Sequence, residues 1–219
     1  MKIVVAGTGY VGLVTGVCLS EVGYYVTCLD IDEKKVEMMN KGNSPIYEPQ
    51  LDELMKKNHS EGRLLFTIDY INAYKDADVI FIGVGTPEKE DGSANLDYVY
   101  TVAEQIADNI EKDCLVVVKS TVPIGTNDEI ENFIKDNLKN NVDVEVASNP
   151  EFLAQGTAVK DTLYAKRIVI GAESEKAKIT LKEIYNRFNI PMLITNRRSA
   201  EMIKYASNDF LALKVSFIN

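Results

Sequence analysis

The sequence contains a single histidine, three cysteines and no tryptophan in 219 residues. His59 lies in a polar stretch that we expect to be a solvated helix end, which argues against a His–Asp relay or a histidine metal site. Cys18, Cys28 and Cys114 have neither metal-ligand spacing nor a pairing pattern, as in proteins of a reducing compartment. Each is expected to be a small buried hydrophobic residue. We therefore predict no metal site and no cysteine nucleophile in this stretch of chain.

Long apolar runs and an excess of positive charge are also missing. No apolar run approaches the roughly 20 residues that span a bilayer, and the formal net charge is −9. Nucleic acids and anionic membranes require a basic surface, so neither is expected as the main partner. Met1 leads directly into an apolar stretch, which leaves no room for a signal peptide. These features predict a cytoplasmic protein.

The sequence does contain a regular alternation of short β-branched strands and helical segments. Strands are expected at residues 2–6, 24–29, 64–68, 78–83, 114–119, 142–147, 167–171 and 191–195. Helices are expected between them, at residues 13–22, 32–40, 50–58, 98–110, 124–138 and 174–188. Short crossovers between strands favour a parallel sheet with helices on both faces. The predicted fold class is α/β, a doubly wound, mostly parallel, Rossmann-like sheet.

The last expected element is a long helix over residues 199–218, which follows a domain of residues 1–198. This helix stops on an apolar stretch, residues 212–219, with no glycine or basic cluster to end it. Such a face would be an exposed apolar patch. We expect the chain to be a fragment, in which further protein or another subunit normally covers residues 199–219.

A glycine pattern joins the first strand to the first helix. Gly7 permits a tight turn, Gly9 lets the backbone approach a diphosphate, and Gly12 lets helix and strand pack closely. The N-terminus of the helix offers free N–H groups to the phosphates. Asp30 ends the next strand, where its carboxylate can accept both hydroxyls of an adenine ribose and repel a 2′-phosphate. This context predicts NAD rather than NADP, with S-adenosylmethionine as the alternative ligand.

Three loops follow later strands at the edge where ligands of open α/β sheets bind. They span residues 83–87, 120–123 and 149–156. Each of the first two is, taken alone, ordinary turn chemistry. Beside a dinucleotide motif, however, two hydroxyl-bearing loops favour a cofactor site. The residues that would form it are Gly85, Thr86, Pro87, Ser120 and Thr121.

Glu151 is the strongest candidate for acid–base chemistry. Asn149 is expected to cap a short helix that starts at Pro150, which would fix the direction of the Glu151 carboxylate. That carboxylate can act as a general base or simply favour the helix dipole. Lys204 and Asn208 share one face of the last helix. Lys204 can bind a diphosphate or stabilise an oxyanion while Asn208 holds a water, or it can be a snorkelling surface lysine.

Motif segments in this order resemble the nucleotide-sugar 6-dehydrogenases, the UDP-glucose/GDP-mannose dehydrogenase family, over the whole chain. The segments are residues 5–13, 44–49, 85–87, 119–125, 149–153 and 200–204, with Asn208. The resemblance implies oxidation of the C6 hydroxymethyl of a nucleotide sugar to a carboxylate by two NAD in succession, through a cysteine thiohemiacetal and thioester. Within the family, Tyr47 favours UDP-glucose as the substrate over UDP-N-acetylmannosamine or GDP-mannose. The product would then be UDP-glucuronate, which is used for polysaccharide synthesis. The resemblance also implies a homodimer paired through the long helix.

By position, the resemblance also assigns roles to residues. The implied NAD site consists of Gly7, Gly9, Tyr10, Val11, Gly12, Asp30, Lys35, Gly85, Thr86, Pro87, Ser120, Thr121 and Gln155. The implied catalytic residues are Thr121 to position a water, Glu151 as the base of the hydrolytic step, Lys204 to stabilise the oxyanion, and Asn208 to orient the sugar. The implied substrate contacts are Glu151, Phe152, Leu153, Gln155, Lys204 and Asn208.

Two departures from the family pattern limit what this chain is expected to do. Gln155 stands where the family usually has a glutamate, and an amide cannot take up a proton. The family's catalytic cysteine and its paired aspartate lie beyond residue 219, and without that nucleophile no covalent intermediate forms. The chain is therefore expected to bind NAD without completing the oxidation. A non-catalytic NAD-binding module is the remaining alternative.

Overall fold

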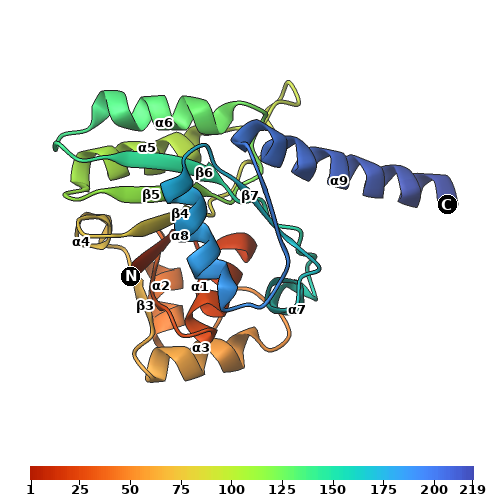
Figure 1. Ribbon diagram of the computed structural model, residues 1–219. Coiled ribbons are helices and arrows are strands. Elements are labelled where there is room, and N and C mark those ends of the chain that lie inside the picture. The colour runs from red at the N-terminus through yellow and green to blue at the C-terminus, as the bar shows by residue number, and fades with distance from the viewer.

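The computed structural model describes all 219 residues and contains an eight-stranded sheet with helices on both faces (Figure 1). The strands are β1 (Lys2–Ala6), β2 (Tyr25–Leu29), β3 (Leu64–Thr67), β4 (Val79–Ile82), β5 (Cys114–Val118), β6 (Val144–Ser148), β7 (Ile168–Gly171) and β8 (Met192–Thr195). Their order is β3-β2-β1-β4-β5-β6-β7-β8. Chain order therefore reverses between β1 and β4, the switch point at which doubly wound sheets bind ligands. The predicted fold class is confirmed.

The helices divide between the two faces of the sheet. They are α1 (Tyr10–Glu21), α2 (Glu33–Asn40), α3 (Leu51–Ser60), α4 (Tyr70–Tyr74), α5 (Asp97–Asn109), α6 (Thr126–Asn137), α7 (Ala158–Leu163), α8 (Glu175–Asn186) and α9 (Arg197–Ile218). Buried side chains of α1, α2, α3, α7 and α8 form one core, and those of α4, α5 and α6 form the other. Helices α4 and α7 were not expected from the sequence, because helices of five and six residues are too short to show a helical period.

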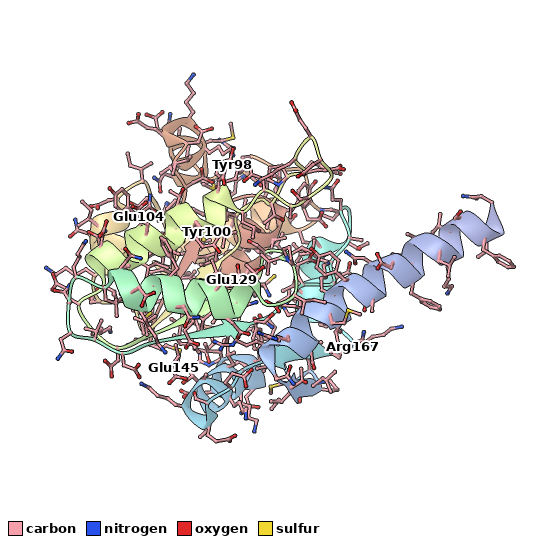
Figure 2. The ribbon with its side chains drawn as sticks, turned by 90° about the horizontal axis from the view of Figure 1, so that it is seen from above. Tyr98, Tyr100, Glu104, Glu129, Glu145 and Arg167 are labelled. Atoms are coloured by element: carbon pink, nitrogen blue, oxygen red, sulfur yellow. The ribbon has the colours of Figure 1, made fainter.

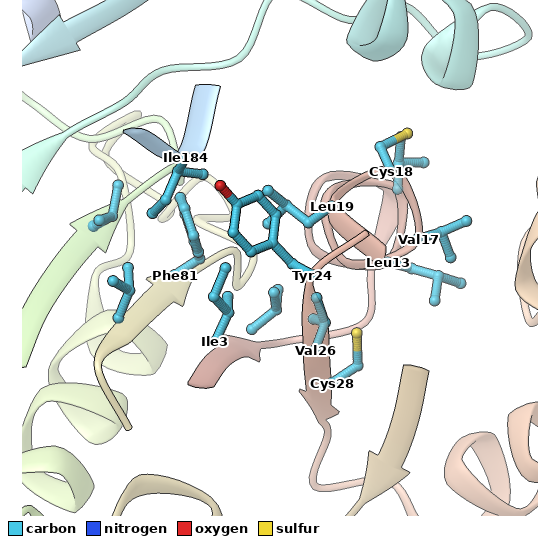
Figure 3. Packing of buried hydrophobic residues seen from close by; sticks show 14 of the residues in the cluster. Ile3, Leu13, Val17, Cys18, Leu19, Tyr24, Val26, Cys28, Phe81 and Ile184 are labelled. Atoms are coloured by element: carbon cyan, nitrogen blue, oxygen red, sulfur yellow. The ribbon is translucent and has the colours of Figure 1, made fainter. Parts of the chain in front are cut away.

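The cysteines lie inside these cores. Cys18 on α1 and Cys28 on β2 belong to the buried apolar cluster of which Figure 3 shows a part. The helix approaches the sheet closely here because Gly16 has no side chain; a Cβ at Gly16 would lie 2.2 Å from the Cys28 sulfur. Burial raises the pKa of each thiol, including that of Cys114 on β5, to about 12. The prediction that the cysteines are buried is confirmed.

Strand β7 departs from the parallel arrangement that the alternation of elements favours. It runs antiparallel to β6 and pairs with it only through Ser148 and Gly171. The reason is the connection between them, which contains only the short helix α7 and does not cross the sheet. Instead of a longer ladder, the Asn149 side-chain nitrogen donates to the Val169 carbonyl oxygen at 2.8 Å. Strand β8 is again parallel to β7, after the crossover through α8.

Helix α9 starts at Arg197, two residues before the expected start, and then leaves the body of the molecule (Figure 1). Its beginning packs on β6, β7 and α6. The buried Glu201 carboxylate accepts hydrogen bonds from Gly125 N at 2.6 Å and Asn127 N at 2.9 Å, which fixes the helix to the start of α6. From Asn208 onward every residue is exposed. None of the helices combines the length and the apolar character that crossing a bilayer requires.

Candidate functional site

The turn between β1 and α1 has the geometry of a diphosphate-binding loop. Gly7 has a φ of +92°, a left-handed conformation that glycine adopts without strain. A Cβ at Gly12 would lie 1.9 Å from the Gly7 carbonyl oxygen, so only glycine lets the helix start this close to the strand. A Cβ at Gly9 would meet nothing within 4 Å, and no side chain caps α1. The free N–H groups of the helix therefore face open space that a diphosphate can enter.

A cleft of about 390 Å³ opens beside this loop, at the switch point of the sheet. This volume is within the range of small-molecule sites. The cleft brings together part of the predicted NAD set, namely Gly7, Gly9, Asp30, Lys35 and Gly85. Its other wall comes from α5, whose Tyr98 is labelled in Figure 2. The cleft therefore offers a backbone loop, a carboxylate and an apolar wall to one extended ligand.

Asp30 is 9% exposed and is held by the glycine loop. One carboxylate oxygen accepts from Thr8 N at 2.9 Å and from the Thr8 hydroxyl. The other accepts from Asp32 N at 3.0 Å. Burial opposes ionisation of Asp30, but these hydrogen bonds, with the charge of Lys35, hold its pKa below the usual value. Asp30 is therefore ionised, and its remaining lone pairs can accept ribose hydroxyls.

Hydrogen bonds join the two hydroxyl-bearing loops to each other. The Thr86 hydroxyl donates to the Thr121 carbonyl oxygen at 2.9 Å. The Ser120 hydroxyl donates to the Val84 carbonyl oxygen at 2.6 Å. The proton of Ser120 is thus used within the protein, whereas the half-buried Thr121 hydroxyl makes no hydrogen bond in the chain and is available to a ligand. Contacts of these loops with NAD stay predictions.

Glu151 and Lys204 form a shielded ion pair. The Lys204 Nζ lies 2.7 Å from Glu151 Oε1, and Leu153 N donates to Glu151 Oε2 at 2.7 Å. Lys204 is 6% exposed, and its Nζ lies 5.6 Å from the centre of the Phe152 ring. Lys204 is therefore not a snorkelling surface lysine. The arrangement places an ammonium donor and an ionisable oxygen base side by side.

The expectation that Asn149 caps a helix starting at Pro150 is wrong. The segment after β6 has no regular structure before α7, and Asn149 is 1% exposed. Its Oδ1 accepts from Lys119 Nζ at 2.9 Å and from the Tyr185 hydroxyl. A buried ammonium and a buried hydroxyl both need an acceptor, so they take the side chain that local capping would have used. The direction of Glu151 is set by the contacts of its own carboxylate.

Lys119 is a site residue to which sequence reasoning gave no role. It follows β5 directly, is 8% exposed, and lines a cavity of about 60 Å³ with Asn149 and Glu151. Burial lowers the pKa of Lys119 to about 8; the charge of Glu151 opposes this shift and that of Lys204 adds to it. The sequence did contain a signal for the burial of Lys119, because a lysine directly after an entirely apolar strand cannot easily reach the surface.

Glu48 is a second residue that sequence reasoning missed. It is 6% exposed, and its carboxylate accepts from Gly156 N at 2.8 Å and from Ala158 N at 2.6 Å. It thereby caps α7, because the side chain of the helix's own N-cap residue accepts no hydrogen bond from the first turn. This contact ties the loop of residues 44–49 to the loop that carries Glu151.

Some predicted site residues are not brought into these clusters. Asn208 lies one turn beyond Lys204 and is exposed, and Gln155 is exposed as well. The Tyr10 hydroxyl donates to the Tyr47 carbonyl oxygen at 2.9 Å, so this side chain connects α1 to the 44–49 loop. The roles predicted for these residues depend on ligand contacts and stay predictions.

The sequence and the structure of this chain are similar to those of one family of known proteins. Residues 1–189 match the model of the UDP-glucose/GDP-mannose dehydrogenase family, NAD binding domain. UDP-glucose 6-dehydrogenase YwqF of Bacillus subtilis is 56% identical over 219 residues, which are 100% of this chain and 50% of the relative. The structure of a UDP-glucose dehydrogenase from Pyrobaculum islandicum has a TM-score of 0.96 at 41% identity, covering 100% of this chain and 51% of that one.

A second structure, GDP-mannose dehydrogenase from Pseudomonas aeruginosa, has a TM-score of 0.94 at 39% identity, covering 99% of this chain and 51% of that one. The chain thus spans about half the length of the relatives it matches. Its cofactor is NAD, and the S-adenosylmethionine alternative is wrong. The predicted resemblance is confirmed: the chain belongs to the UDP-glucose/GDP-mannose dehydrogenase family, and residues 1–189 match its NAD-binding domain.

Proposed function

We propose that this chain is the NAD-binding part of an enzyme that oxidises the C6 hydroxymethyl of a nucleotide sugar. The proposed substrate is UDP-glucose and the product UDP-glucuronate, with two NAD reduced per turnover. The observation that carries the proposal is the shielded pair of Glu151, on the loop that follows β6, and Lys204, on α9. Similarity to UDP-glucose dehydrogenases and the presence of Tyr47 support the choice of sugar.

The residues present fit NAD, because the glycine loop is open at Gly9 and Asp30 is ionised beside it. Bound NAD would accept the hydride from the sugar carbon. Lys204 has three N–H groups, so it can donate to an oxyanion while keeping its contact with Glu151. Glu151 would take a proton from water in the hydrolytic step, and the free hydroxyl of Thr121 would orient that water.

In the complete protein, we propose that the nucleophile comes from outside this chain and that two copies of the protein form a dimer. All three cysteines of this chain are buried, so we place the nucleophilic cysteine outside these 219 residues. Gln155 would hydrogen-bond without exchanging protons. The exposed apolar side chains of α9 support a homodimer paired through this helix. We propose that this dimer is cytoplasmic and provides uronate for polysaccharide synthesis.

Two measurements test the proposal. Titration calorimetry of this chain should detect NAD binding and at least tenfold weaker binding of NADP, because Asp30 repels a 2′-phosphate. The full-length protein should release two NADH for each UDP-glucose consumed, measured by NADH absorbance. Full-length Glu151→Gln should keep its NAD affinity and lose turnover. NAD binding without NADH formation from UDP-glucose, UDP-N-acetylmannosamine or GDP-mannose would instead establish the binding-module alternative.

A further inference from the structure

The hydroxyl group of Tyr74 has no hydrogen-bond partner in the chain. Tyr74 is the last residue of α4, and its side chain is 0% exposed. Burial raises the pKa of this hydroxyl, so it keeps its proton and has a hydrogen-bond donor without an acceptor. Buried polar groups in native proteins nearly always have a partner, so a group without one calls for an explanation.

The position of Tyr74 in the NAD cleft supplies that explanation. Buried side-chain atoms without a partner occur at three residues, Tyr74, Asn127 and Arg197, and of these only Tyr74 lines the cleft. Helix α4 starts just after β3 ends, at the carboxyl edge of the sheet. Because Cα–Cβ bonds of a helix tilt toward its N-terminus, the Tyr74 side chain extends back toward that edge.

The surroundings of Tyr74 identify the part of the ligand that reaches it. The cleft wall that includes Tyr74 also contains Leu29, Tyr98 and Val102, and these side chains offer apolar surface to a flat aromatic base. Asp30, which follows Leu29 directly, is the residue placed to hold the adenine ribose. The base attached to that ribose would therefore enter the region of the cleft next to Tyr74.

We propose that Tyr74 is a specificity-determining residue for the cofactor, and that its hydroxyl donates a hydrogen bond to a ring nitrogen of the adenine of NAD. The ring nitrogens of adenine are acceptors, which match a donor without a partner. The inference rests on NAD as the cofactor of this chain and adds the base contact, which neither the glycine loop nor Asp30 provides.

The test compares wild type and Tyr74→Phe by titration calorimetry with NAD and with ADP-ribose, which share the adenosine half. The variant should bind both ligands about threefold to tenfold more weakly, by the same factor, because one neutral hydrogen bond is lost. Without ligand, Tyr74→Phe should melt at the same temperature as wild type or higher, since a buried unpaired hydroxyl is removed. With saturating NAD, wild type should gain more in melting temperature than the variant.

Tyr24→Phe is the matched control. The Tyr24 hydroxyl donates to the Glu183 carbonyl oxygen at 3.1 Å, in the core on the other face of the sheet. Its removal should lower the melting temperature without ligand and leave NAD affinity unchanged. Equal NAD affinities of wild type and Tyr74→Phe would overturn the inference and leave the proposed function intact. A lower melting temperature of ligand-free Tyr74→Phe would also overturn it, whereas a wild type that binds no NAD would overturn the proposed function itself.

Discussion

At the scale of single residues, burial shifts the pKa values of the cysteine thiols and of Lys119. The thiols of Cys18, Cys28 and Cys114 have pKa values raised to about 12 from 9.0. Above pH 9 the unfolded chain loses these protons while the folded chain keeps them, so stability falls as pH rises from 9 toward 12. Lys119 acts in the opposite sense: its pKa is lowered from 10.5 to about 8, and its contribution to stability rises with pH between these values.

These opposite signs give a pH prediction. Urea unfolding of this chain should show a lower free energy of unfolding at about pH 10 than at pH 7. Each thiol should lower this free energy by about 1 kcal/mol, and Lys119 should offset part of the loss. Cys28→Ala should make the loss shallower by about 1 kcal/mol, and Lys119→Met should make it steeper. A decline of equal slope in all three proteins would show that these groups titrate alike in the folded and unfolded states.

The ion pair of Glu151 and Lys204 gives a second prediction at this scale. Lys204→Met leaves the Glu151 carboxylate shielded without its cation and should lower the free energy of unfolding by about 3 kcal/mol. The double variant with Glu151→Gln should lose less than the sum of the single variants, with a coupling of about 1–3 kcal/mol. Denaturant titration of the four proteins measures this coupling. Additive losses would mean that the two side chains do not interact in solution.

At the scale of elements, the turn from β1 into α1 separates a requirement of folding from a requirement of binding. Gly12→Ala places a Cβ 1.9 Å from the Gly7 carbonyl oxygen, so helix and strand must move apart. This variant should lose about 3 kcal/mol of stability or fail to fold. Gly9 has a φ of −72°, which alanine adopts freely, and its Cβ would meet no protein atom.

Gly9→Ala should therefore melt within about 2 °C of wild type and bind NAD about tenfold more weakly or worse, since the Cβ projects into the space that the diphosphate would enter. Thermal melts together with titration calorimetry give both quantities for each protein. An unchanged NAD affinity of Gly9→Ala would show that the diphosphate does not approach α1.

At the scale of the whole molecule, α9 leaves a row of large apolar side chains uncovered. They are Phe210, Leu211, Leu213, Val215, Phe217 and Ile218, each at least 54% exposed. Apolar groups repeated along one helix gain stability by packing on a second surface. We expect this chain to associate with rising concentration in sedimentation velocity runs. The variant Leu213→Glu/Phe217→Glu should remain monomeric with unchanged NAD affinity; a wild type that stays monomeric at all concentrations would contradict association through α9.

The sequence by itself determined the order of the strands and of the longer helices, the fold class, the glycine loop and the acid beside it. The physical reason is that these features depend on contiguous residues. The period of apolar residues indicates which segment is a strand or a helix, and the missing Cβ of Gly7 and Gly12 acts within one turn. The motif context therefore also predicted NAD, before any contact was known.

Only the tertiary structure decided which polar groups meet in the interior. The hydrogen bond that Tyr185 donates to Asn149 spans 36 residues of chain, and the one that Ala158 N donates to Glu48 spans 110. Such partners follow from how the elements pack, as do the antiparallel direction of β7 and the unpaired hydroxyl of Tyr74. Local patterns carry no information on these pairs, because a buried polar group takes whichever partner the folded chain brings within hydrogen-bond distance.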